Sequence, residues 1–380
     1  MLDLVCFCHL RWDFVYQRPQ HLLSRFAKLH RVFFIEEPVF HDNHDNSLRI
    51  SENTENLWIV VPHLRHGMSF QEIENIQQGL LNDLFEEREI KRYMFLYYTP
   101  MAWGISSHLK PELVIYDCMD ELSTFKFAPP ELKPREKQLF EKADIVFTGG
   151  HNLFHAKKDH HSNIHPFPSS IDKEHFSKAR QINNDPADQE AIPHPRFGFY
   201  GVVDERFDLE LIGRVAEMKP EWHFIIIGPV VKIDPEILPR PANIHYLGSK
   251  SYSELPNYLA GWDLAIVPFV RNESTKYISP TKTPEYLAGG IPVISTSIVD
   301  VIRPYGDLGL VHIADTPEGF ILAAEKELNN TDKSQWLEMV DEHLQNNSWD
   351  NTWNMMMSHI SKKLHEPKHL INNLNQEAYV

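Results

Sequence analysis

The sequence predicts an α/β protein built from two similar domains. Its length of 380 residues exceeds the size at which a single hydrophobic core usually stops growing, about 250 to 300 residues. Short apolar runs of strand length alternate with segments whose apolar residues recur at helical spacing, which is typical of parallel sheets covered by helices on both faces. This alternation is interrupted once and then begins again.

The first half contains one complete series of alternating strands and helices. Leu22, Leu23, Phe26 and Leu29 illustrate the helical spacing of apolar residues. The predicted helices are 17–29, 70–90 and 130–142, and the predicted strands are 2–8, 31–35, 57–61, 93–97, 113–116 and 144–148.

The interrupting segment is rich in Pro, Asp, Asn and Ser, and its apolar residues follow no period, as is usual for a linker. A second series follows it. The predicted strands there are 196–200, 222–227, 244–247, 263–267, 291–295 and 310–313, and the predicted helices are 208–218, 252–259, 284–288, 317–328, 334–344 and 349–364. Gly289 and Gly290 suit a left-handed cap at the end of the helix 284–288.

These elements predict two Rossmann-like, doubly wound parallel-sheet domains that face each other across a cleft, followed by a helical C-terminal tail. We expect the first domain over residues 1–168, a linker over 169–194 and the second domain over 195–348. The tail, 349–380, could pack back on the first domain. Ligands of such sheets lie beyond the carboxyl ends of the strands, so functional residues are expected in the loops from strand to helix.

Composition narrows the range of partners. The formal net charge of −16 argues against a non-specific nucleic-acid-binding protein, because phosphate backbones are bound by clustered Lys and Arg. The same charge disfavours docking to an anionic membrane, so that contact with a membrane is expected to be peripheral at most. The sequence leaves the oligomeric state open.

The cysteines and the N-terminal residues bear on the compartment. Cys6 and Cys8 lie two residues apart in a predicted strand, so they share one face and could not easily bond to each other. We expect these thiols and that of Cys118 to be free and buried, as in a reducing compartment. The first residues have no basic region and only a short apolar run, so we expect neither a signal peptide nor a membrane span. The protein is therefore expected in the cytoplasm, where it could bind peripherally to the inner face of the membrane.

The loop after the predicted strand 263–267 is the most informative part of the chain. Thr283 is a good N-cap and Pro284 a good first helical residue, so the amides of this helix start and the ammonium of Lys282 could bind an anion. Glu285 could accept hydrogen bonds from neutral hydroxyls beside it. The arrangement fits a nucleotide, with its phosphates on Lys282 and its ribose on Glu285. Alternatively, Glu285 only complements the helix dipole and Lys282 is a solvated charge.

Further candidates follow predicted strands of the first half. Asp117 and Asp120 are expected at a carboxyl edge that faces the cleft, where one of them could position or deprotonate an acceptor hydroxyl. Alternatively, such an Asp caps the following turn. Trp12, Gln17 and Arg18 follow the first strand.

Arg18 could approach a diphosphate or an acceptor anion, or Arg18 and Pro19 could simply begin a helix. His151 follows the strand 144–148 and could also face the cleft. His151 and His155 have helical spacing, but neither cysteines nor a metalloprotease pattern accompany them, and the spacing of Asp117 and Asp120 is not Asp-x-Asp. No metal is expected.

The string Pro-Thr-Lys-Thr-Pro-Glu-Tyr-Leu-Ala-Gly-Gly-Ile-Pro-Val-Ile, residues 280–294, resembles the donor-binding signature of GT-B glycosyltransferases in the retaining class related to glycosyltransferase family four, also called group 1. Other segments that resemble the same class are 143–148, 170–176, 197–201, 243–248 and 253–263. Trp12 with the segment 17–21 resembles a subgroup found in bacterial surface-polysaccharide and teichuronic-acid clusters.

The resemblance implies transfer of a sugar from a nucleoside diphosphate sugar to an acceptor hydroxyl, with retention and without a metal, in bacterial polysaccharide or glycoconjugate synthesis. No cofactor is expected, and a UDP-sugar is favoured over a GDP-sugar as donor. The acceptor would be a carbohydrate or a lipid-linked glycan. The implied donor-binding residues are Gly201, Arg206, Gly248, Ser249, Lys250, Ser279, Thr281, Lys282, Thr283 and Glu285. Arg206 and Lys282 would stabilise the departing diphosphate, and Asp117 or Asp120 would act on the acceptor.

Two positions depart from the pattern of the class. The class often carries a second glutamate eight positions before the ribose-binding one, where this chain has Tyr277. It also often carries a basic pair shortly after the glycine at 201, where Arg206 is the sole candidate here. Two other functions therefore stay open: a nucleotide-sugar 2-epimerase of the same fold, and a subunit that binds nucleotide sugar without turnover.

Overall fold

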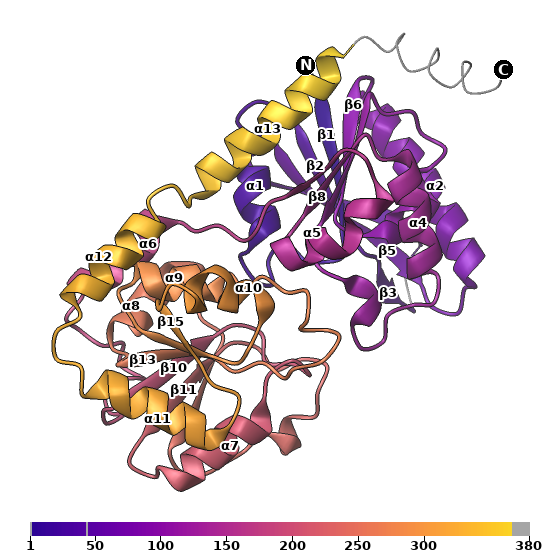
Figure 1. Ribbon diagram of the computed structural model, residues 1–380. Coiled ribbons are helices and arrows are strands. Elements are labelled where there is room, and N and C mark those ends of the chain that lie inside the picture. The colour runs from indigo at the N-terminus through magenta and orange to yellow at the C-terminus, as the bar shows by residue number, and fades with distance from the viewer. Residues whose placement is uncertain (1, 43–44, 367–380) are drawn as a thin grey trace.

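The first half of the chain forms a large sheet. A computed structural model describes residues 2–42 and 45–366 of the protein (Figure 1). The strand order is β3-β5-β2-β1-β6-β7-β8-β9, and all these strands are parallel. The strands are β1 Asp3–Cys8, β2 Val32–Glu36, β3 Val39–His41, β5 Leu57–Arg65, β6 Tyr93–Tyr97, β7 Leu113–Cys118, β8 Ile145–Thr148 and β9 Ile164–Pro166.

Three strands of this sheet, β3, β4 and β9, were not expected. β4, Ser47–Thr54, pairs antiparallel with β5, so the first sheet is mixed rather than wholly parallel. Most residues of β4 are exposed and polar, so this segment does not form the apolar run that predicts a buried strand.

Helices cover both faces of the first sheet. They are α1 Arg18–Phe26, α2 Phe70–Glu87, α3 Trp103–Ser106, α4 Leu132–Lys142 and α5 His151–Lys157. β1 supplies Cys6 and Cys8 to the core on one face and Phe7 to the core on the other, because successive side chains of a strand point to opposite sides. The three cysteines of the chain are buried and free.

The second half forms a smaller, wholly parallel sheet. Its order, β12-β11-β10-β13-β14-β15, is the Rossmann order 3-2-1-4-5-6 counted from its first strand. The strands are β10 Arg196–Tyr200, β11 His223–Ile227, β12 Ile244–Gly248, β13 Leu264–Val267, β14 Val293–Ser295 and β15 Val311–Ile313. The helices are α6 Lys173–Ser177, α7 Leu209–Met218, α8 Leu255–Ala260, α9 Lys282–Ala288, α10 Val299–Val301, α11 Pro317–Leu328 and α12 Ser334–His343. The predicted α/β class with two parallel-type sheets and a helical C-terminal region is confirmed.

The chain crosses between the halves twice. Ile171 and Phe176, which follow β9, are buried in the core of the second half, so much of the segment expected as a linker packs there. The return crossing lies beside the first one, since the amide of Trp349 donates to the carbonyl of Ile171 over 3.2 Å. Beyond it, α13, Trp349–His365, lies along the first half (Figure 1). Trp349, Met356 and Ile360 are buried there in the core beneath α1.

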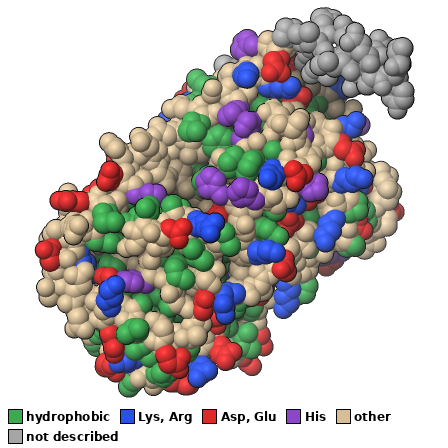
Figure 2. All heavy atoms as spheres, in the orientation of Figure 1, with side chains coloured by type: hydrophobic (Ala, Val, Ile, Leu, Met, Phe, Trp, Pro, Cys, Tyr) green, Lys and Arg blue, Asp and Glu red, His purple; other side chains and the backbone are tan. Residues whose placement is uncertain are grey.

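The surface carries charged side chains of both signs. On the face shown in Figure 2, Lys and Arg are interspersed with Asp and Glu rather than gathered into one patch. Among the described residues, no helix combines the length and apolar character that a bilayer span requires.

Candidate functional site

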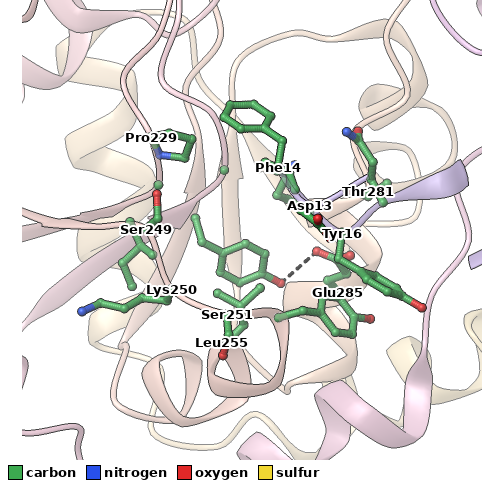
Figure 3. A pocket seen from close by; sticks show the side chains of 18 of the residues that line it. Asp13, Phe14, Tyr16, Pro229, Ser249, Lys250, Ser251, Leu255, Thr281 and Glu285 are labelled. Atoms are coloured by element: carbon green, nitrogen blue, oxygen red, sulfur yellow. Dashed lines mark hydrogen bonds between the residues drawn. The ribbon is translucent and has the colours of Figure 1, made fainter. Parts of the chain in front are cut away.

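A cavity with a volume of about 510 Å³ lies between the two halves (Figure 3). The second half lines it at the point where the chain leaves β10 and where α9 begins, which is the switch point of the Rossmann order. The first half covers it with the loop after β1. The lining residues include Trp12, Phe14, Tyr16, Gln17, Gly201, Gly228, Ser249, Lys250, Tyr252, Thr281, Lys282 and Glu285. We call this the donor cavity.

Two glycines keep the floor of the donor cavity open. Gly201 has φ +148, and a Cβ there would lie 2.7 Å from Cε of Lys282. Gly228 has φ +138, and a Cβ there would lie 1.9 Å from the carbonyl oxygen of Gly201. Only glycine satisfies both the backbone conformation and the close approach at these positions.

The helix below the donor cavity begins earlier than expected. Thr281, not Thr283, is the N-cap of α9, and its side chain makes no capping bond. Pro284 is tolerated at the third helical position, because the amides of the first turn have no intrahelical partner. The prediction of Thr283 as N-cap is therefore wrong. The Thr283 side chain is fully buried, and its hydroxyl has no hydrogen-bond partner.

Lys282 and Glu285 form the charged part of the donor cavity. Burial lowers the pKa of the Lys282 ammonium, and the nearby Glu285 carboxylate partly offsets this. Burial also raises the pKa of Glu285 to about 7, although Lys282 and the Tyr200 hydroxyl both stabilise its ionised form. The Tyr200 hydroxyl donates to Oε2 of Glu285 over 2.9 Å, the bond drawn in Figure 3. A ligand that brings phosphates to Lys282 and hydroxyls to Glu285 fits this pair.

Aromatic residues beside Glu285 were not singled out in the sequence. Tyr252 lines the donor cavity, and its buried hydroxyl has no partner. The Tyr16 ring packs at a tilt against that of Tyr252 with centroids 4.7 Å apart, and Phe14 is 46% exposed although it lines the cavity. Their place after a buried strand was the only signal that could have identified Phe14 and Tyr16.

A smaller cavity of about 130 Å³ adjoins the donor cavity, since Thr281, Lys282 and Gln17 line both. Asp120 and Arg206 face each other across it from opposite halves. We call it the reaction cavity. Ser279 also lines this cavity, and its carbonyl accepts a hydrogen bond of 2.7 Å from the Ser169 hydroxyl.

Arg206 is held in place by neighbours from both halves. Its Nη2 donates to Asp204 over 2.7 Å, and its guanidinium lies 5.2 Å from the ring centre of Phe125 in the first half. Burial raises the pKa of Asp120 to about 6, while Arg206, Arg18 and Lys282 act in the opposite direction. The reaction cavity thus combines cations that could stabilise a leaving diphosphate with one carboxylate that titrates near neutrality.

Asp117 lies below the reaction cavity instead of facing it. Its side chain is fully buried, and both of its oxygens accept from the guanidinium of Arg18 over 2.9 Å. Arg18 also donates to the carbonyl of Phe167 over 2.8 Å, which engages each of its side-chain nitrogens. Arg18 and Pro19 do begin α1, with Gln17 as the N-cap.

Other predicted residues take different places. Lys250 lines the donor cavity, and its ammonium pairs with Asp188, which is not a lining residue. Gly248 has φ +69 but does not line either cavity. His151 is exposed at the start of α5, and its amide donates to Asp300 of the second half over 2.9 Å. Tyr277 packs against the core of the first half and lines neither cavity.

Within residues 2–42 and 45–366, no three His, Cys, Asp or Glu side chains are grouped so that they could hold a metal ion. His165 instead packs against His359 of α13, with tilted rings whose centroids are 3.8 Å apart.

The sequence is similar to those of known glycosyltransferases. Residues 195–330 match the family of glycosyl transferases group 1. The chain is 23% identical over 365 residues to a putative teichuronic acid biosynthesis glycosyltransferase of Bacillus subtilis (strain 168), covering 83% of this chain and 90% of the relative.

Solved structures share the fold at low identity. Sucrose-phosphate synthase from Thermosynechococcus elongatus superposes with a TM-score of 0.70 at 13% identity, over 96% of this chain and 99% of that one. An alpha,alpha-trehalose-phosphate synthase (UDP-forming) from Burkholderia vietnamiensis gives 0.68 at 12% identity, over 95% and 99%. HepE of Anabaena in complex with UDP and glucose gives 0.65 at 12% identity, over 95% and 100%. At this low sequence identity, the superpositions show that the fold is shared and nothing more.

Proposed function

We propose that the chain, which has a GT-B fold and a group 1 match over residues 195–330, is a glycosyltransferase that transfers a sugar from a nucleoside diphosphate sugar to a hydroxyl of a carbohydrate acceptor. The observation that carries the proposal is that Lys282 and Glu285 both line the donor cavity and are near enough to influence each other's pKa. A nucleoside diphosphate needs a cation for its phosphates and an acceptor for its ribose hydroxyls, and this floor supplies both.

The donor is proposed to be a UDP-sugar. Two of the solved structures of this fold are described with UDP, as a complex of HepE or as a UDP-forming synthase. The diphosphate would lie near Gly201, where the absence of a side chain leaves room beside Lys282. The sugar would then extend into the reaction cavity, which Lys282 also lines.

The chemistry follows from the charges of the reaction cavity. The departing diphosphate gains negative charge, and Lys282 and Arg206 are the cations that could stabilise it. Asp120, which belongs to the first half, could hold the acceptor hydroxyl or accept its proton. We further propose retention at the anomeric carbon, because residues 280–294 resemble the donor-binding signature of the retaining group 1 class.

The place of action is part of the proposal. We place the protein in the cytoplasm with at most peripheral membrane contact. The three buried cysteines are free, as is usual in a reducing compartment, and the formal net charge is −16.

A donor screen tests this function. The purified protein would be titrated with UDP, GDP and their sugars, and each sugar nucleotide that binds would be incubated with and without a panel of glycoside acceptors. We expect UDP-sugars to bind more tightly than GDP-sugars and to give glycoside product only with an acceptor. An altered sugar formed from donor alone would indicate an epimerase, and tight binding without any product would indicate a non-catalytic subunit.

A further inference from the structure

A second cavity lies at the switch point of the first sheet. The strand order reverses between β1 and β6, and a cavity of about 330 Å³ opens beyond the carboxyl ends of these two strands. Ligands of doubly wound sheets bind at such points, and the volume is within the usual range of about 300 to 1,000 Å³ for small-molecule sites. We call this the apolar cavity. It does not share a lining residue with the donor or reaction cavity.

The walls of this cavity are mostly hydrophobic. They come from β1, β2, β3, α2 and the segment after β6, and include Phe7, Ile35, Phe40, Ile73, Met101 and Ile105. At the rim, Phe40 and Phe70 leave 37% and 44% of their surface exposed. Aromatic rings that face water at the mouth of a cavity gain free energy when an apolar group covers them.

The ionisable groups of the apolar cavity disfavour anions. Neither Lys nor Arg is among its lining residues in the described part of the chain, whereas Glu36, Glu37 and Glu74 are. Arg11 lies 2.9 Å from Glu36 and Arg135 lies 2.6 Å from Glu74, so two of these carboxylates are already paired. A phosphate would therefore meet carboxylates without a free cation, while an uncharged apolar group would meet hydrocarbon walls.

Two segments connect the apolar cavity with the reaction site. After β7, Asp120 lines the reaction cavity and Pro129 lines the apolar cavity. Between them, the Phe125 ring lies below two cations of the second half, at 5.2 Å from the Arg206 guanidinium and 5.6 Å from the Lys232 ammonium.

The loop after β1 makes the other connection. Trp12 lines the donor cavity, and its amide donates to Glu36 of the apolar cavity over 2.8 Å. The loops after β1 and β7 thus each run between the apolar cavity and the cavities at the interface of the two halves, at the carboxyl edge of the first sheet.

Resting on the proposed function, we infer that the apolar cavity binds an uncharged apolar group attached to the acceptor sugar. The acceptor hydroxyl lies at Asp120, and the alkyl or aryl group at the other end of the acceptor lies against Phe40, Ile73 and Met101. The acceptor is accordingly an amphipathic glycoside rather than a free sugar or a sugar phosphate. The alkyl and aryl alternatives share this chemistry and are separated by the test.

The test measures binding of defined probes to the full chain without turnover. Calorimetric titration would compare n-octyl β-D-glucoside below its micelle concentration, phenyl β-D-glucoside, methyl β-D-glucoside and glucose 1-phosphate. We expect the octyl or the phenyl compound to bind at least about tenfold more tightly than the methyl compound, because a single methylene in an apolar pocket can change affinity by that factor. Equal dissociation constants for octyl, phenyl and methyl glucoside, or tightest binding of glucose 1-phosphate, would overturn the inference.

Variants locate the binding. Ile73→Asn places an amide in the wall, and Phe40→Ser removes a ring at the rim without disturbing a buried position; each is expected to weaken octyl glucoside by about tenfold. Leu29→Ser, at a side chain 54% exposed elsewhere on the first half, is the matched control and should leave binding unchanged. Octyl glucoside binding that is unaffected by both cavity variants would place the ligand elsewhere and also overturn the inference.

The outcomes separate this inference from the proposed function. Loss of the octyl preference with normal binding of UDP would refute the inference alone. Failure of the protein to bind any nucleotide would refute the proposed function, and with it the assignment of the apolar cavity to an acceptor. Once a donor is known, a lower KM for octyl or phenyl acceptors than for the methyl acceptor, abolished by Phe40→Ser with kcat retained, would support the inference during turnover.

Discussion

Arg18 and Asp117 form a bidentate ion pair in which Nε donates to Oδ2 and Nη2 donates to Oδ1, each over 2.9 Å. The pair is buried, and the remaining Nη1 donates to the carbonyl of Phe167 over 2.8 Å. It thereby joins the start of α1, the end of β7 and the segment that leads to the second half. This geometry indicates a structural role for Asp117, and it leaves Asp120 as the carboxylate that faces the acceptor side.

Asp117→Asn tests the structural role. The substitution leaves the buried Arg18 guanidinium without its counter-charge, which is expected to lower the free energy of unfolding by about 3 to 5 kcal/mol. Urea denaturation followed by circular dichroism measures the change. The control is Asp350→Asn, because Asp350 pairs with Arg25 but is 69% exposed, and its loss should cost less than about 1 kcal/mol. Unchanged stability of Asp117→Asn with lost turnover would instead assign Asp117 to the chemistry.

Lys282→Ala tests the diphosphate contact. Loss of a buried ammonium that binds phosphate is expected to weaken UDP by about 10- to 100-fold, because hydrogen bonds to charged groups contribute about 1.5 to 3 kcal/mol. Uridine, which has no phosphate, should bind the variant and the wild type equally. Titration calorimetry with both ligands measures this, and Lys276→Ala on the same loop, where the lysine side chain is 49% exposed, is the control. Equal affinity of Lys282→Ala and wild type for UDP would remove Lys282 from the site.

Asp120 predicts a pH dependence of the acceptor reaction. Its folded-state pKa of about 6 lies above the ordinary value of 3.8, because burial disfavours the charged form. A general base acts only when ionised, so kcat/KM for the acceptor should rise as the pH increases through about 6. Asp120→Asn should remove this rise and lower the plateau by about 10²- to 10⁴-fold. A profile in which wild type and variant keep the same ascending limb would exclude Asp120 as the base.

Glu285 predicts a pH dependence of donor binding. Its pKa of about 7 is raised by burial, so the carboxylate is largely protonated below that pH and ionised above it. Only the ionised group accepts hydrogen bonds from both ribose hydroxyls without donating one, so the affinity for UDP-glucose should increase as the pH rises through about 7. UDP-glucose is the suitable ligand because the charge of its diphosphate stays constant in this range. Glu285→Gln should weaken binding and abolish the dependence, whereas a retained dependence in the variant would point to another group.

The raised pKa values of Asp120 and Glu285 also predict how the free energy of unfolding depends on pH. Asp120 and Glu285 both have folded-state pKa values above their ordinary ones, so the folded state holds its protons more tightly than the unfolded state. Stability from this source is greatest below the ordinary values and decreases as the pH rises to about 7. Urea midpoints of the double variant Asp120→Asn/Glu285→Gln should therefore fall less between about pH 5 and about pH 8 than those of the wild type. An equal fall in both proteins would contradict the shifts.

Gly150→Ala tests the contact between the halves. The Asp300 carboxylate accepts from the amides of His151 and Asn152 over 2.9 and 3.0 Å, and a Cβ at Gly150 would lie 2.2 Å from its Oδ2. The added methyl group should separate the halves, which small-angle X-ray scattering would detect as a larger radius of gyration, and should lower turnover.

Asp300→Ala removes the same contact from the other side and should give the same two changes. The double variant should show no further change, because both substitutions break one contact. Additive effects would mean that the two residues act independently.

Part of the architecture follows from local pattern. The alternation of apolar strands and amphipathic helices correctly predicted two parallel-type sheets, because strand and helix periods are properties of a few consecutive residues. It missed the short strands β3 and β9 and the largely exposed β4, and it placed the N-cap of α9 at Thr283 instead of Thr281. A proline within the first turn does not indicate which of its positions it occupies.

Residues close together in the chain were enough to predict the α/β class, the division into two halves and the loop that carries Lys282 and Glu285. Two contacts became known only from the folded protein: Asp117 binds Arg18, 99 positions away, and Tyr277 packs on the first half. The apolar cavity likewise exists only where β1, β2 and β6 end side by side. Contacts between distant residues depend on how whole elements pack, which no local period specifies.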